Sequence, residues 1–220
     1  MRDMKTSIAI GVMALVAILG PAKESSAQSV DPLTTAQNSS GNGFGAAWAS
    51  PPGSLFNQRQ VARFNSAGTG TASVAGGAWT AFLPQFNTTG SSSASVLTYR
   101  QDSSFSTIDL SGIASMSFDI AVTGSVTLSW FIGDSNGAII DFPGPFTLSA
   151  GSSTQTLNFS TANIDPGFDV TAVERMEIRI SAASANSSIS VTNFTYTLVP
   201  TPGAAAVLGL GGLLAARRRR

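Results

Sequence analysis

One pattern constrains the fold more than any other feature of the chain: apolar and polar residues alternate over residues 115–132. The apolar positions are Met116, Phe118, Ile120 and Val122, followed by Val126, Leu128, Trp130 and Ile132. Successive side chains of a β-strand point to opposite faces, so this alternation predicts strands with one buried face. Thr123-Gly124 separates the two runs and predicts the tight turn of a β-hairpin.

Similar short segments recur from about residue 60 onward, separated by Gly, Asn, Asp, Ser and Pro, and no helical period interrupts them. Two short strands are predicted at 146–148 and 154–159, and longer ones at 173–180 and 189–198. The alternation of the last strand changes phase near Thr192-Asn193, which indicates a β-bulge. Residues 59–198 are therefore predicted to form one antiparallel β-sandwich. Their order of strands resembles a jelly roll of the galactose-binding type.

The N-terminus has the organisation of a secretory signal peptide. Arg2 and Lys5 are basic, residues 7–20 are apolar, and Ser25-Ser26-Ala27 supplies the small residues that signal peptidase reads. We expect residues 1–27 to be removed by cleavage after Ala27. The Ser-, Gly- and Ala-rich residues 28–58 are then predicted to be a flexible leader.

The C-terminus combines a proline motif, an apolar segment and a basic end. Pro200-Thr201-Pro202 precedes residues 203–216, which carry no charge and are apolar all round. As a helix this segment would span roughly 21 Å, less than the roughly 30 Å of bilayer hydrocarbon. A basic cluster stays on the cytoplasmic side of a membrane. Residues 203–216 are therefore predicted to be a transmembrane helix, and a plain tail anchor is the alternative to a sorting signal.

The three-part order of residues 199–220 resembles the PEP-CTERM sorting signal of bacterial exported proteins. The resemblance implies processing by an exosortase-type protease and delivery to the cell surface or to the extracellular polysaccharide matrix. It also implies recognition through Pro200 and Pro202. The residues implied to stop transfer are Arg217, Arg218, Arg219 and Arg220. Thr201 stands where the motif has Glu, which bears on the identity of the sortase.

The composition excludes several classes of chemistry. The chain has no Cys and no His. It therefore has no disulfides, no Ser-His-Asp triad and no ordinary histidine site for zinc, copper or non-haem iron. The formal net charge is +0, but residues 28–198 hold five arginines against ten acidic residues. This acidic balance argues against nucleic acid as a partner.

Three acceptor side chains could form a calcium site. Asp134, Asn136 and Asp141 supply the hard oxygen ligands that calcium prefers. The alternative is turn chemistry, because Asp and Asn before Gly form local hydrogen bonds with the backbone. No other cofactor is expected.

Aromatic and acidic residues suggest two further functions. Trp79 lies beside turn residues and is the best candidate for an exposed ring that stacks on a sugar. Asp109 and Asp119 could serve glycoside hydrolysis, although their spacing does not place them across a cleft.

The sequence as a whole favours an exported, non-enzymatic β-sandwich with a structural or adhesive role at the cell surface or in the matrix. The alternative is a carbohydrate-binding module for exopolysaccharide, and a less favoured one is a carboxylate-dependent glycoside hydrolase. Expected partners are signal peptidase, the exosortase-type protease, the membrane and extracellular polysaccharide.

Overall fold

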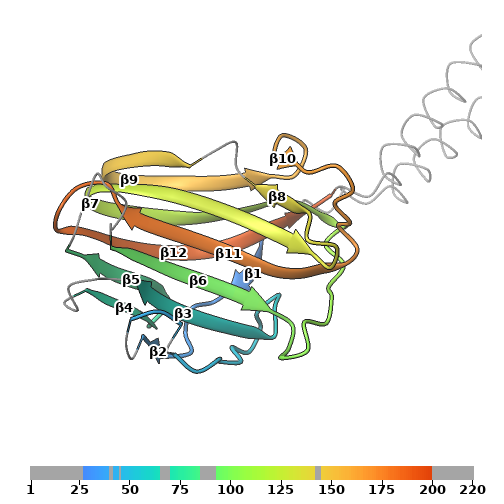
Figure 1. Cartoon of the computed structure of the whole chain (residues 1–220), viewed down its shortest axis with the longest axis horizontal. Coiled ribbons are helices and arrows are strands. Elements are labelled where there is room, and N and C mark those ends of the chain that lie inside the picture. Colours follow the sequence, from blue (N-terminus) through green and yellow to red (C-terminus); the bar gives the residue numbers. More distant parts are fainter. Residues whose placement is uncertain are drawn as a thin grey trace, which may run out of the picture. The chain divides into compact units, whose positions relative to one another are not determined.

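The regular structure of the described residues is entirely antiparallel β (Figure 1). The computed structural model describes residues 27–39, 42–44, 46–64, 70–84, 93–141 and 145–199. The strands are β1 (Gln28–Asp31), β2 (Gln37–Asn38), β3 (Gln58–Phe64), β4 (Thr71–Ala75), β5 (Ala78–Leu83), β6 (Ala94–Arg100), β7 (Ile113–Asp134), β8 (Ile139–Asp141), β9 (Phe146–Asn158), β10 (Asn163–Ile164), β11 (Val173–Ala182) and β12 (Ser187–Leu198). The prediction of an all-β antiparallel sandwich is confirmed.

Strand β7 organises the whole sheet. One of its edges pairs with β9. The other edge pairs with β12 over the first half of β7 and with β11 over the second half. Beyond β12 follow β5, β4 and β2, and beyond β11 follow β6 and β3. A single hydrogen-bonded sheet therefore divides into two layers that both begin at β7.

The two layers face each other across the core. Phe194 of β12 packs against Tyr99 of β6, with ring centroids 5.8 Å apart, and against Trp130 at 5.7 Å. Trp79 of β5 donates its indole N–H to Ser95 Oγ of β6 at 3.1 Å. The alternating residues predicted to be apolar and buried on β7 lie in this core, since Phe118 and Trp130 are both about 1% exposed.

The predicted hairpin at Thr123-Gly124 is wrong, because β7 runs through this position as one strand of 22 residues. Gly124 has a φ of 81°. The register of β7 against β9 shifts between Val122 and Ser125. The glycine is therefore a β-bulge, which bends the strand where it passes from one layer to the other. Pairing with β9 along both halves keeps the chain extended where an isolated segment would turn back.

The remaining predictions for strands and bulges had different outcomes. The two short strands expected around Gly151 are one continuous strand, β9. The predicted strand at 173–180 is confirmed as β11. The bulge predicted near Thr192-Asn193 is also confirmed, since the register of β12 shifts between Thr192 and Thr195 and Asn193 has a φ of 53°.

The N-terminal segment is held by a buried polar network. Asp31 of β1 is 1% exposed and Arg59 of β3 is fully buried, and they form an ion pair of 2.6 Å. Tyr99 donates its hydroxyl to the same Asp31 oxygen at 3.0 Å, and the Leu33 N–H donates to the other oxygen at 2.7 Å. Burial, and then the neighbouring Asp31 carboxylate, raise the pKa of the Tyr99 hydroxyl, so this hydroxyl remains a donor. Gln37 accepts from Arg59 Nε at 3.3 Å.

The flexible leader predicted at residues 28–58 is therefore wrong for its described part. β1 pairs with β12, β2 pairs with β4, and Val30 and Phe56 are fully buried. The compact unit runs from Ala27 to Leu198, so it begins about thirty residues earlier than the predicted domain. The described part of the chain contains no helix able to cross a membrane. The predicted signal peptide, apart from Ala27, and the predicted helix at 203–216 lie outside the described residues.

The buried ion pair yields a stability prediction. Arg59→Met leaves the Asp31 carboxylate buried and uncompensated, so we expect the free energy of unfolding to fall by about 3–5 kcal/mol in urea titration. The double variant Asp31→Leu/Arg59→Met removes both charges and should recover much of this loss. Arg179→Met, on the exposed side of β11, is the matched control. Equal effects of Arg59→Met and Arg179→Met would contradict the role given to the pair.

The bulge yields a second prediction. A Cβ atom on Gly124 would lie 2.7 Å from Ser187 Oγ and 3.2 Å from Ser187 Cα. Gly53 has a similar φ of 75° but open space around it. We expect Gly53→Ala to destabilise by about 1–2 kcal/mol through backbone strain. Gly124→Ala should destabilise clearly more, as measured by thermal unfolding. Identical losses would show that close packing at the corner is unimportant.

Candidate functional site

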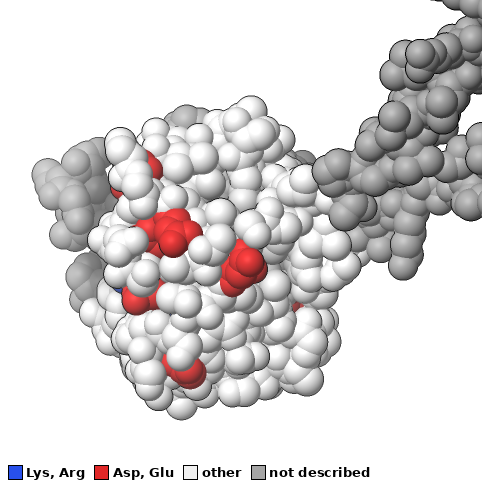
Figure 2. Space-filling view, turned by 90° about the vertical axis from the view of Figure 1, so that its right-hand side faces the viewer, with Lys and Arg blue, Asp and Glu red and all other residues white. Residues whose placement is uncertain are grey.

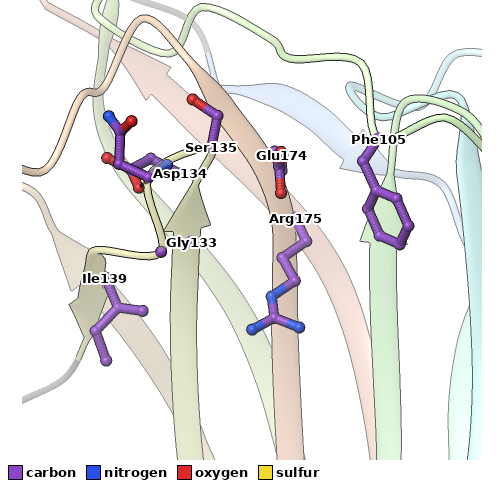
Figure 3. Close-up of a pocket in the computed structure, with 9 residues that line it drawn as sticks. Phe105, Gly133, Asp134, Ser135, Ile139, Glu174 and Arg175 are labelled. Carbon is purple, nitrogen blue, oxygen red and sulfur yellow. Dashed lines mark hydrogen bonds between the residues drawn. The ribbon is translucent and has the colours of Figure 1, made fainter.

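A pocket of about 500 Å³ opens at one end of the sandwich, beside the first residues of β11 (Figure 3). Arg175 lies in the middle of this pocket, with Phe105 on one side and Ile139 on the other. The remaining lining residues are Gly133, Asp134, Ser135, Asn136, Gly137 and Glu174. Three separate segments thus contribute: the loop after β6, the turn after β7 and the start of β11.

Asp134 builds the turn that forms one wall of the pocket. Its Oδ1 accepts the N–H groups of Asn136 and Ala138, both at 2.9 Å, and its Oδ2 accepts the N–H of Asp169 at 2.8 Å. The hydrogen bond from Asp169 is the main cause that lowers the pKa of the Asp134 carboxyl. This carboxylate therefore stays ionised and fixes the wall of the pocket.

The geometry does not support the calcium site expected at Asp134, Asn136 and Asp141. Both oxygens of Asp134 are occupied by backbone N–H donors. Among the described residues, no three His, Cys, Asp or Glu side chains are grouped so that they could hold a metal ion. Asp134 instead stabilises its own turn by accepting backbone N–H groups, which is the alternative that the sequence left open.

Phe105 is held in an unfavourable conformation at the mouth of the pocket. Its φ is 57°, a left-handed value that is rare for a bulky side chain, and its side chain is 46% exposed. Asp102 stabilises this turn, because its Oδ1 accepts the N–H of Ser104 at 2.8 Å and that of Ser106 at 3.0 Å. A strained, exposed aromatic ring beside a pocket is typical of a binding site.

The outer face of β6 and β11 carries arginines packed on aromatic rings. Arg100 Cζ lies 3.7 Å from the centroid of the Trp48 ring and 5.2 Å from that of Phe105. Arg175 Cζ lies 5.5 Å from the Phe131 ring. These distances are those of cation–π contacts. We call the surface formed by Trp48, Arg100, Phe105, Phe131, Arg175 and Arg179 the arginine face.

The end of the sandwich next to this face is acidic. Figure 2 views the end where the loops after β6 and β7 emerge, and it shows several Asp and Glu groups but almost no Lys or Arg. The positive charges of the arginine face therefore lie beside a negatively charged end.

Trp79, predicted to be an exposed sugar-stacking residue, is instead fully buried. Its position on β5 points it between the layers, where its indole N–H is bonded to Ser95. The prediction is wrong because the Gly76-Gly77 turn beside Trp79 does not expose the strand that follows it. Both rings that the structure places at the site, Phe105 and Trp48, lie in loops.

The structure does not bring Asp109 and Asp119 together at the pocket. Asp109 lies in the loop before β7 and accepts the Ser111 N–H at 2.8 Å. Asp119 accepts from Asn193 Nδ2 at 2.7 Å and Thr154 Oγ1 at 2.6 Å. These hydrogen bonds lower the pKa of both carboxyls, which keeps them ionised and unsuited to act as a general acid. Neither residue lines the pocket.

Sequence reasoning missed Phe105, Arg100 and Arg175. A usable signal for Phe105 is its position in the polar turn Asp102-Ser103-Ser104-Phe105-Ser106, where an aromatic residue is out of place. The two arginines are 75 positions apart and meet only because β6 and β11 pair. No local pattern could have indicated that meeting.

Comparisons with known proteins identify no family. No protein-family model and no curated protein matches the sequence. Among solved structures, a family 11 carbohydrate-binding module of a cellulosomal cellulase of Clostridium thermocellum is similar at 14% identity, over 79% of this chain and 95% of that chain, with a TM-score of 0.46. A carbohydrate-binding module specific for non-crystalline cellulose is similar at 13% identity, over 62% and 80%, with a TM-score of 0.42. An agarase is similar at 13% identity, over 64% of this chain and 22% of that chain, with a TM-score of 0.45.

Proposed function

We propose that the domain is a non-catalytic glycan-binding module that is exported and presented at the cell surface or in the extracellular matrix. The observation that carries this proposal is Phe105, whose ring stands exposed at the pocket in a strained conformation. Strain of this kind persists only where the surrounding structure imposes it, and it concentrates at binding sites.

The pocket combines the two kinds of contact that sugars need. The Phe105 ring offers an apolar face for the C–H side of a pyranose. Glu174, Arg175 and Asn136 offer acceptors and donors for hydroxyl groups around it. A few polar groups converging on an apolar platform suit a neutral or charged sugar better than a purely apolar ligand.

The limits of the folded unit support the export part of the proposal. The compact unit begins at Ala27, where signal peptidase is expected to cleave, and ends at Leu198, just before the Pro200-Thr201-Pro202 motif. Cleavage at either end would leave this unit intact. An exosortase-type protease would thus release or transfer a complete β-sandwich.

A structural role in the matrix is the second candidate, and strand β9 favours it. β9 has thirteen residues without charge or proline, and among the described strands it pairs only with β7. Natural edge strands usually carry charge or proline that prevents pairing with other chains. The binding experiment below separates the two candidates, since a purely structural protein would bind no glycan.

The glycan-binding role predicts that a substitution at Phe105 weakens glycan binding and leaves the stability of the fold unchanged. Phe105→Asn removes the ring but suits a positive φ, so we expect weaker retardation in polysaccharide affinity gels without loss of thermal stability. Phe82→Asn, on the exposed side of β5, is the matched control and should migrate like the parent protein. No reducing sugar should be released from any retarding polysaccharide. Unchanged retardation of Phe105→Asn would exclude this pocket as the site.

The export proposal predicts the mass of the mature protein. Protein recovered from the outer surface or medium of its native host should lack residues 1–27 and the residues that follow the Pro200 motif, as measured by intact-mass spectrometry. Any additional mass would identify a group attached at the new C-terminus. A protein that keeps residues 203–220 and stays in the membrane fraction would mean that the tail is a plain anchor.

A further inference from the structure

Two arginines of the arginine face stand directly opposite each other. Arg175 of β11 and Arg100 of β6 are paired in the antiparallel register. Like charges placed opposite each other on neighbouring strands destabilise a sheet. The pairing therefore raises the question of what offsets the repulsion.

Described carboxylates act on this pair only at longer range: Asp102 interacts electrostatically with Arg100, and Glu177 with Arg175. Arg100 donates through Nε to Gln58 Oε1 at 2.9 Å, a neutral acceptor. The Arg175 guanidinium donates no hydrogen bond to any described side chain or carbonyl. Neither arginine forms an ion pair with a described residue, in contrast to Arg59 with Asp31. Most of their N–H donors are therefore available to a ligand.

Aromatic rings hold both guanidinium groups in place. Trp48 lies under Arg100 at 3.7 Å, and Phe131 lies beside Arg175 at 5.5 Å. Stacking of this kind limits the rotamers of a long side chain, so less conformational entropy is lost when a ligand binds. The pair is thus preorganised for an anion whose oxygens accept two hydrogen bonds.

The rest of this face carries one further arginine and one carboxylate. Arg179 lies four residues beyond Arg175 on the same side of β11, about 13 Å along the strand. Glu177 lies between these two arginines and forms no ion pair with either among the described residues. Burial raises the pKa of the Glu177 carboxyl, while Arg175 and then Arg179 oppose this shift.

We propose that Arg100 and Arg175 together bind the carboxylate or sulfate group of an acidic glycan, and that Arg179 binds a further anionic group along the same chain. This inference rests on the proposed glycan-binding function and names its ligand class. Guanidinium groups match carboxylate and sulfate oxygens, while the neighbouring rings of Phe105 and Trp48 match the apolar faces of sugars.

The test compares charged and neutral forms of the same polymers. The full chain, purified in detergent, is titrated with polygalacturonate and with its carboxyl-reduced form, and with dextran sulfate and dextran. We expect at least tenfold tighter binding of one charged polymer than of its neutral form, weakening as salt is raised. Which of the two charged polymers binds identifies carboxylate or sulfate as the group.

Variants then assign the binding to the pair. Arg100→Gln and Arg175→Gln should each weaken binding of the charged polymer at least tenfold, with unchanged thermal unfolding. Thr156→Glu, on exposed strand β9, changes the net charge by the same amount and should have little effect. Arg175→Lys keeps the charge but not the planar fork, so it should restore only part of the affinity.

Three results would overturn the inference in distinguishable ways. Equal binding of charged and neutral polymers, unaffected by the arginine variants, would reject the anion site but leave the glycan-binding function intact. Binding of none of these polymers, nor of mixed-linked β-glucan or agarose, would reject both. Binding of duplex DNA as tight as that of the preferred polymer would show a general polyanion surface.

Discussion

The buried ion pair between Asp31 and Arg59 is the polar contact that links the two layers of the sandwich. Its members come from β1, which pairs with β12, and from β3, the last strand of the opposite layer. Tyr99 of β6 shares the same carboxylate oxygen. One carboxylate therefore joins both layers.

A buried charge is tolerated only when an opposite charge and hydrogen-bond donors surround it. The network therefore makes the N-terminal segment an obligatory part of the fold. In a chain without cysteine it links segments that a disulfide could otherwise connect.

The bulge at Gly124 has a comparable effect on geometry. Because β7 bends there and continues, its first half supports the layer with β12, and its second half supports the layer with β11. The end of β7 then delivers the Asp134 turn beside the first residues of β11, while β6 delivers the Phe105 loop to the other side. The pocket is a consequence of where these strands end. Its walls are fixed by turns that are themselves bonded internally, chiefly through Asp134 and Asp102.

The sequence predicted what depends on local periodicity and missed what depends on pairing partners. The alternation around Phe118 and Trp130, and the phase change at Asn193, follow from the side-chain period of two, and the structure contains both. The corner at Gly124 looks locally like a hairpin turn. Only the continuous neighbour β9 makes it a bulge. The 28–58 segment has a loop-like composition, yet Asp31 finds its partner 28 residues away. The meeting of Arg100 and Arg175 is non-local in the same way.

The arrangement of acidic residues explains how a domain with twice as many acids as bases can expose arginines that form no ion pair. Asp102, Asp109, Asp134 and Asp169 each accept backbone N–H groups of their own turns. Carboxylates engaged in this way stabilise loops, and their geometry keeps them directed at the backbone. Their oxygens are directed at backbone N–H groups, and none of them forms an ion pair with the arginines of the neighbouring sheet face. The arginines are retained on aromatic rings that stabilise them without neutralising them. An anion supplied by a ligand is the component that would complete the charge balance of this face.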